Sequence, residues 1–322
     1  MKHHMYICGV FSFLLPIRRD LLSSLPLFLL LPLLWSCIAE ELEGCPVGME
    51  LQLEYTFNPS NEDKFAQSVQ GGEFFLYDAD GQLLQRRSLT STEIASARMP
   101  LKLAPGSYTC VLWGNWQPAD YRFTAEETLK GMKLSLIEQD GRVENRPQPL
   151  FHASAELEIK PQTPGKHRLS LHKSTNVIHV ILEGAMSGVQ PTRDISSGTS
   201  YGMTLTGSNG VYNHDNTPAT GRELTYFPDY IRFVPGYKNA LGADFTVMRL
   251  WKGDDMRLFI TNGTQVMVDR PLTEMLMQSD KINTDDDLDR YDEYTLRFDS
   301  NYMLTGIKVD DWTEVGQSGG GI

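Results

Sequence analysis

The sequence predicts an all-β protein built of two tandem β-sandwich domains with short helices. Short runs in which apolar and polar residues alternate recur along most of the chain, and this alternation is typical of half-buried strands. Gly, Pro, Asn and Asp separate these runs, and long helical periods are rare. Short strands at close spacing with turns between them favour β-sandwiches over a parallel sheet.

The N-terminal segment has the charged, apolar and small-residue series of a secretory signal. Arg18 and Arg19 precede an apolar run at 21–35, which is followed by Ser36 and Cys37. A signal that stops at a small residue before a cysteine resembles a bacterial lipoprotein signal. We therefore expect removal of the signal peptide and acylation of Cys37. The alternative is an ordinary secreted protein cut near Ser36.

The apolar run is too short to cross a bilayer and contains two prolines. A spanning helix needs about 20 consecutive apolar residues. Each buried methylene of an acyl chain contributes about 0.8 kcal/mol to membrane binding, so a lipid with several chains suffices as an anchor. We expect the chain to be attached to a membrane by its lipid and not to span it.

The overall charge excludes a nucleic-acid-binding protein. The formal net charge is -12, and loss of residues 1–36, which carry three basic residues and one acidic residue, changes it to -14. Such an acidic chain lacks the basic stripe that neutralises phosphates.

The cysteines suggest one disulfide bond. Once Cys8 leaves with the signal and Cys37 carries lipid, only Cys45 and Cys110 remain. In an oxidising compartment we expect them to form a bridge, which would stabilise the fold by about 4 kcal/mol on the chain-entropy model. The alternative is that Cys110 is a buried free thiol within a strand.

The first domain is predicted to begin with five strands, four of which are joined in pairs by two turns. Residues 50–57 alternate as a half-buried strand, and Asp80-Gly81 joins strands 73–78 and 82–89 in a hairpin. Pro105-Gly106 predicts a second hairpin between 98–103 and 108–113. Further along, a Thr and a Glu in capping-box spacing predict a helix at 124–130, and strands are expected at 132–136 and 155–159.

The second domain is expected to begin after the Pro- and Gly-rich linker at 161–165. Its expected strands are 167–172, 176–183, 202–206, 230–234, 244–251, 256–261, 265–268, 294–298 and 304–309, with a short helix at 271–278. The resulting division is a signal peptide at 1–36, a tether at 37–48, an N-terminal sandwich at 49–162 and a C-terminal sandwich at 163–322.

The sequence contains no convincing catalytic motif, and we expect no enzyme and no cofactor. Residues 198–202 read GTSYG and fit the serine-hydrolase pattern around Ser200. That pattern needs a strand before it and a helix after it, whereas an alternating strand-like run follows here. His179 alternates with apolar neighbours and is interpreted as a polar residue on the outer side of a strand.

Two further groups of residues suggest ligands, and each has a simpler explanation. The acidic run at 285–289 lacks the turn glycine and final glutamate of a calcium-binding loop, so a solvated acidic loop is preferred and no metal is expected. Trp113 and Trp116 could form a sugar-stacking platform for a glycan. The alternative is that they close the end of a sandwich.

The ordered set of motifs resembles the fimbrillin-type pilus anchor family of Bacteroidetes. The similarity covers about residues 37–315 and rests on GCP at 44–46, ELQLEYTF, LYDADG, APGSYTCVLWGN, LHKSTNVIHVILEG and IKVDDW. It implies two transthyretin-like β-sandwiches on a lipid, and a minor subunit that fixes a fimbrial shaft to the outer membrane and limits its length. The acidic pair Glu40-Glu41 resembles the tag that exports such lipoproteins to the cell surface, although a polar tether would also be acidic.

The resemblance also implies the kind of partner. Shaft subunits would bind by strand addition, in which an extended segment of one subunit completes the sheet of another. The tail at 316–322 shows no alternating donor strand, so we expect this subunit to accept a strand. The competing hypothesis is a surface adhesin or glycan-binding lipoprotein, such as a tip subunit, on the same fold.

Overall fold

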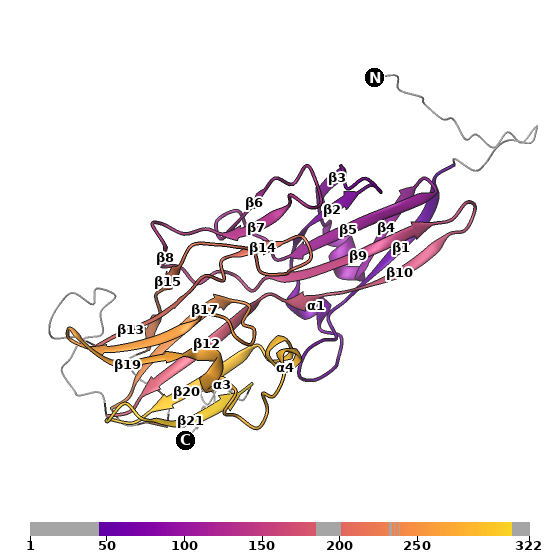
Figure 1. Ribbon diagram of the computed structural model, residues 1–322. Helices are drawn as coiled ribbons and strands as arrows, with labels where there is room; N and C mark the ends of the chain where they lie inside the picture. The colour runs from indigo at the N-terminus through magenta and orange to yellow at the C-terminus, as the bar shows by residue number, and fades with distance from the viewer. Residues whose placement is uncertain (1–44, 185–200, 232–233, 235, 238, 311–322) are drawn as a thin grey trace, which may run out of the picture.

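The computed structural model describes residues 45–184, 201–231, 234, 236–237 and 239–310, and Figure 1 shows that β-strands dominate these ranges. The prediction of an all-β fold made of sandwiches with short helices is confirmed. The elements of the N-terminal half are β1 (Val47–Glu54), α1 (Phe65–Ser68), β2 (Gly72–Tyr77), β3 (Leu83–Ser88), α2 (Ser91–Ser96), β4 (Arg98–Leu103), β5 (Gly106–Gly114), β6 (Tyr121–Thr124), β7 (Lys133–Leu136), β8 (Arg142–Val143), β9 (Phe151–Ile159), β10 (Gly165–Ser170) and β11 (His172–Lys173).

The N-terminal sandwich pairs a three-stranded sheet with a five-stranded one. The strand orders are β10-β1-β4 and β11-β9-β5-β2-β3. Strand β1 shows how the sequence specifies this packing, because Leu51 and Leu53 are buried while Glu50 and Glu54 lie on the other face and reach solvent. Between the sheets lies a core that includes Phe74, Leu112 and Leu169.

The predicted second hairpin is wrong, because its two strands belong to different sheets. Strand β4 pairs with β1, whereas β5 pairs with β2 and β9. The turn before Gly106 therefore carries the chain from one sheet to the other. The physical reason lies in β5, whose residues are apolar on both faces. Cys110 and Leu112 face one core and Val111 and Trp113 face another, so β5 needs the centre of a sheet.

The predicted helix at 124–130 is also absent, and this stretch forms turns after β6. Ala125 has a φ of 50°, a left-handed conformation that stops a helix at its first residue, and Thr128 bridges to Gln82. A capping box forms elsewhere, where Thr90 and Glu93 hydrogen-bond reciprocally at the start of α2. The helix prediction at 124–130 is therefore wrong, and the helix that does start with a capping box, α2, was not predicted.

The C-terminal sandwich consists of two five-stranded sheets. Its elements are β12 (Thr175–Leu182), β13 (Tyr201–Gly207), β14 (Val211–Asn213), β15 (Leu224–Tyr226), β16 (Asp229–Ile231), β17 (Leu241–Met248), β18 (Arg257–Asn262), β19 (Gln265–Pro271), α3 (Leu272–Leu276), α4 (Asp285–Arg290), β20 (Glu293–Phe298) and β21 (Leu304–Val309). The strand orders are β16-β17-β12-β20-β21 and β19-β18-β13-β15-β8. The short helix expected at 271–278 is confirmed as α3.

The two sandwiches share strands and a core. Strand β10 lies beyond the expected linker but pairs with β1, so the chain leaves the N-terminal sandwich later than the sequence indicated. In turn β8, from the N-terminal half, pairs with β15, and β14 joins β7 and β6 in a third small sheet. One hydrophobic cluster runs from Phe75 and Trp113 through to Leu276 and Val309. Figure 1 shows β8 beside β15, and β14 beside β7, where the two sandwiches meet.

Candidate interaction site

The junction between the sandwiches contains a half-buried acidic pair, Asp292 and Asp310. The Tyr55 hydroxyl donates to Asp292 Oδ2 at 2.8 Å, and Lys173 Nζ lies 3.5 Å from the same oxygen. Asp310 Oδ1 accepts the backbone N–H groups of Asp292 and Glu293 at 3.2 and 3.0 Å. Burial and the nearby Asp292 carboxylate raise the pKa of Asp310 to about 6. These contacts tie the end of β21 and the start of β20 to the N-terminal domain.

Helix α4 supplies a second set of contacts across the junction, and it corrects the prediction of a solvated acidic loop at 285–289. The side chain of Thr284 and that of Asp287 form a capping box, and acidic residues are favourable in the first turn of a helix. At the other end of α4, the Arg290 guanidinium lies 4.5 Å from the centre of the Phe57 ring and donates to the Asn58 carbonyl at 3.4 Å. The acidic run thus begins a helix whose last residue contacts the other domain.

His179 lies between two carboxylates in the middle of the C-terminal sheet. Its Nδ1 is 2.7 Å from Asp244 Oδ1 on β17, and its Nε2 is 2.7 Å from Glu293 Oε1 on β20. Burial disfavours the charged ring, but these hydrogen bonds outweigh it and raise the pKa of His179 to about 9. The residue is on the outer side of the strand, as predicted, yet it is buried and ion-paired.

The structure does not join Cys45 to Cys110, so the expected disulfide is not formed. Cys110 is a buried free thiol in the N-terminal core, and burial raises its pKa to about 12. It pairs with Leu76 and Ala155 within the five-stranded sheet. Cys45 precedes β1, whose Val47 pairs with Leu103 at the end of the other sheet, so the two cysteines belong to separate layers.

The two tryptophans do not form a sugar platform together. Trp113 is fully buried, and its ring centre lies 4.5 Å from that of His152. Trp116 is half-buried and stacks on Phe123 at 5.2 Å between ring centres, with the Arg86 guanidinium 5.9 Å away. Trp113 therefore cannot present a ring face to a glycan, whereas Trp116 remains partly exposed.

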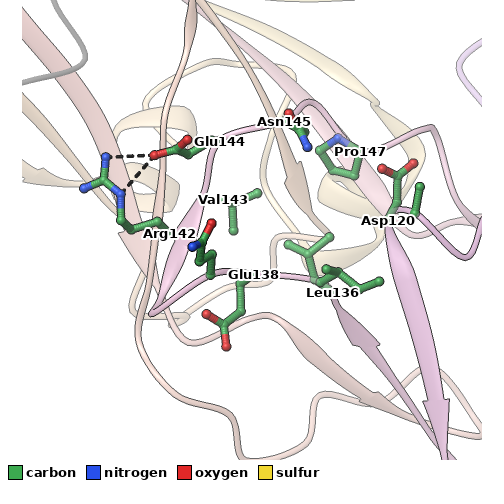
Figure 2. A pocket seen from close by; sticks show the side chains of 11 residues that line it. Asp120, Leu136, Glu138, Arg142, Val143, Glu144, Asn145 and Pro147 are labelled. Carbon is green, nitrogen blue, oxygen red and sulfur yellow. Dashed lines mark hydrogen bonds and ion pairs between the residues drawn. The ribbon is translucent and has the colours of Figure 1, made fainter.

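A cavity of about 220 Å³ lies between β7, β8 and the loop that follows β8 (Figure 2). Buried Leu136 and Val143 contribute apolar side chains to its lining, and three carboxylates lie around it. Each of these carboxylates is held by the protein itself. Asp120 accepts from the Gln148 N–H, Glu138 pairs with Arg222 and Glu144 pairs with Arg142. The cavity holds no nucleophile with an adjacent base, so its lining supports no catalysis.

Several predicted residues lie outside the described part of the chain. These are the signal peptide, Cys37, the Glu40-Glu41 pair, Ser200 and the tail at 316–322. The residues directly after Ser200 form strand β13, so the helix that a serine-hydrolase elbow requires is not found there. Among the described residues, no His, Cys, Asp and Glu cluster is suited to a metal ion and no helix is long and apolar enough to cross a membrane.

Sequence reasoning missed the junction contacts and the partners of His179. Tyr55 and Asp292 are 237 residues apart, and no local pattern links them. Asp244 could have been suspected as a partner of His179, because both are single charged or titratable residues within largely apolar strands. Glu293 stands beside Asp292 at the start of its strand, and no such signal marks it. The register of these strands, however, is set only by the assembled sheet.

Three solved structures share this architecture. A candidate polysaccharide-binding protein of the DUF1812 group from Bacteroides thetaiotaomicron matches with a TM-score of 0.71 and 19% identity, covering 83% of this chain and 96% of that one. A candidate adhesin from the same organism matches with a TM-score of 0.66 and 21% identity, covering 83% and 97%. The fimbrial anchor protein Mfa2 of Porphyromonas gingivalis matches with a TM-score of 0.65 and 18% identity, covering 83% and 98%. At these identities the likeness shows the fold.

The family of this chain is shown by a match between its sequence and a protein-family model. A comparison with curated protein sequences found no match. The family model of fimbrillin-A associated anchor proteins Mfa1 and Mfa2 matches residues 42–318, which is nearly all of the chain after the signal-like segment. The resemblance found from the motifs is confirmed, and the chain belongs to the family of fimbrillin-A associated anchor proteins.

Proposed function

We propose that this protein is a lipid-anchored minor subunit that attaches a fimbrial shaft to the outer membrane and limits its length. The observation that carries the proposal is the family match over residues 42–318, which begins just after the lipoprotein-like Cys37. No catalytic arrangement occurs among the described residues, and this agrees with a structural role. The proposal accounts for the lipoprotein-like signal segment and the β-sandwich fold, and it requires no catalytic site.

The position of the lipid limits how far the body can lie from the membrane. Strand β1 begins at Val47, ten residues after Cys37. A fully extended chain spans at most about 3.3–3.6 Å per residue, so the tether reaches roughly 35 Å. A subunit held this closely by its N-terminus suits the end of a polymer at the membrane, and the acidic residues 40–41 support exposure on the outer face.

The rigidity of the body supports a role in bearing load. The two sandwiches exchange strands through β8 and β14 and share one hydrophobic core. A pull on one sandwich is therefore transmitted to the other through hydrogen-bonded strands. We propose that the shaft binds by addition of a strand to a free sheet edge, because main-chain hydrogen bonds then supply much of the affinity.

The test is a count of fimbriae on cells and in the medium for wild type and Cys37→Ala. We expect the variant to release fimbriae, especially long ones, into the medium while the shaft still assembles. Cys110→Ala is the matched control, since it alters a cysteine that carries no lipid in this proposal. Fimbriae attached in normal number and length would overturn the anchor role and favour an adhesin, for which Trp116 is the remaining half-exposed ring.

A further inference from the structure

Strand β21 forms one edge of the five-stranded sheet β16-β17-β12-β20-β21, and no other described strand pairs with its outer side. A groove of about 560 Å³ lies beside this edge, between residues 278–281, which follow α3, and residues 304 and 306–309 of β21. The groove thus has a sheet edge as one wall and a segment of loop as the other. This arrangement has the form of a slot for an extended chain.

Two other edge strands, β10 and β19, are as long as β21 or longer, and β21 is preferred to them because of the groove beside it and the half-buried apolar residues on its inner face. The remaining sheet edges that we compare with β21 are shorter or obstructed. Strands β8 and β11 have two residues each, and β14 and β16 have three. Strand β4 contains Pro100, which lacks a backbone N–H donor. In β3, the N–H of the first residue, Leu83, already donates a hydrogen bond to the Glu127 carbonyl. Strand β21 has six residues and no proline.

The core is incompletely covered at β21. Ile307 pairs with Leu296 and Leu304 pairs with Phe298 in the sheet register, so all four side chains face the same core. Leu296 and Phe298 are both 0% exposed, whereas Ile307 and Leu304 are only half-buried. Nearby Met303 is 55% exposed. A further strand with apolar residues on its inner face would cover this surface.

The backbone of β21 also directs groups into the groove. The Asp310 N–H donates to the Glu293 carbonyl, and antiparallel pairs alternate, so Ile307 and Val309 turn their N–H and C=O groups away from β20. The Val309 carbonyl indeed points outward, because it accepts a hydrogen bond from Lys281 Nζ at 3.1 Å. No described backbone group forms a hydrogen bond with the outward-facing N–H and C=O groups of Ile307.

The charges around the groove indicate which side chains an added strand would carry. The chain has a net charge of -12, yet two lysines, Lys281 and Lys308, line this groove together with a single acidic residue, Asp280. Lys308 is exposed on the outer face of the sheet, where an added strand would place a residue opposite it. Oppositely charged cross-strand pairs are favourable, and like charges are unfavourable.

We propose that the outer edge of β21 receives an extended segment of a neighbouring fimbrial subunit, with apolar residues facing Leu304 and Ile307 and an acidic residue opposite Lys308. This inference rests on the proposed fimbrial role and assigns it to one surface. The segment pairs by main-chain hydrogen bonds along β21, and its apolar side chains complete the core of the C-terminal sandwich.

A photo-cross-linking amino acid at Thr305, which is exposed on β21, tests the location in cells that carry fimbriae. The matched control is the same probe at Leu84, which is 54% exposed on the edge strand β3 of the other domain. We expect the Thr305 probe to cross-link a peptide of a shaft subunit with alternating apolar residues, and the Leu84 probe to give no such product.

Other outcomes overturn the assignment. A shaft subunit cross-linked from Leu84 and not from Thr305 would place the interface elsewhere while leaving the anchor role intact. Cross-linking of Thr305 only to residues 311–322 of its own chain would mean that the protein covers this edge itself. If neither probe captures a shaft subunit, the β21 assignment fails, and the count of fimbriae for Cys37→Ala decides separately whether the anchor role stands.

A charge reversal tests the chemistry of the occupant. Lys308→Glu should weaken binding of the purified protein to fimbriae sheared from the same cells by about tenfold, because an attractive pair becomes repulsive. Lys102→Glu, on the edge strand β4, should leave binding unchanged and controls for net charge. Equal binding by both variants, with unchanged folding by circular dichroism, would contradict an acidic residue opposite Lys308.

Discussion

At the scale of single residues, His179 shows how a polar group is kept inside a sheet. Its strand brings Asp244 and Glu293 to either side, and both ring nitrogens have a carboxylate partner at 2.7 Å. A buried charge is tolerated only when paired in this way. The three residues therefore link β17, β12 and β20 across the middle of the sheet.

This pairing predicts that stability depends on pH above neutrality. The pKa of His179 is raised to about 9 in the folded state, whereas an unfolded histidine titrates near 6.5. Its stabilising contribution is fully present below about pH 6.5 and is lost as the pH rises through about 9. The difference corresponds to the order of 3 kcal/mol of unfolding free energy.

Urea unfolding at about pH 6, 7.5 and 9 measures this loss, with His179→Gln as the comparison. The variant should be less stable than wild type at the lowest pH and should lose less stability on going to the highest. Parallel pH profiles for the two proteins would contradict the prediction.

At the scale of elements, the contacts between α4, the start of β20 and the N-terminal domain hold the two sandwiches in one orientation. Tyr55→Phe removes the hydroxyl that donates to Asp292 at 2.8 Å while keeping the ring in the core. Because the buried Tyr55 donates this hydrogen bond to the carboxyl group of half-buried Asp292, the expected loss is about 1.5–3 kcal/mol of unfolding free energy.

Tyr108→Phe provides the control, since the Tyr108 hydroxyl donates to the Ala104 carbonyl close by in the same domain. Chemical denaturation of both variants should show the larger loss for Tyr55→Phe. Equal and small losses would mean that the junction does not depend on this contact.

At the scale of the whole molecule, the shared core predicts a single cooperative unfolding transition. Strand β8 of the N-terminal half completes a C-terminal sheet, and β14 of the C-terminal half pairs with β7. Opening either sandwich therefore exposes core residues of the other. In calorimetry, the van't Hoff and calorimetric enthalpies should agree. Two resolved transitions would show that the sandwiches unfold independently.

The alternation of apolar and polar residues accounts for how much of the fold the sequence predicts. Strands such as β1, β2, β12 and β20 were expected within a few residues of their observed bounds, because burial of one face is a local property that the pattern records. The Asp80-Gly81 turn was correct for the same reason, since the β2–β3 hairpin is a local structure.

Pairing between strands could not be predicted in this way. The β4–β5 turn looks like a hairpin locally, and only the two apolar faces of β5, each covered by a different core, separate its strands into different sheets. Likewise, the spacing of Cys45 and Cys110 says nothing of the layers in which they lie, so the expected bridge does not appear.

By itself, the sequence determined the all-β class, the family and the approximate positions of most strands, because these depend on composition, motif order and local alternation. Only the tertiary structure decided which strands are neighbours, where the sandwiches join, how His179 is paired and which sheet edge is left with a half-covered core. Those features arise from contacts between residues far apart in the chain, whose free energy depends on the assembled sheets and leaves no local pattern.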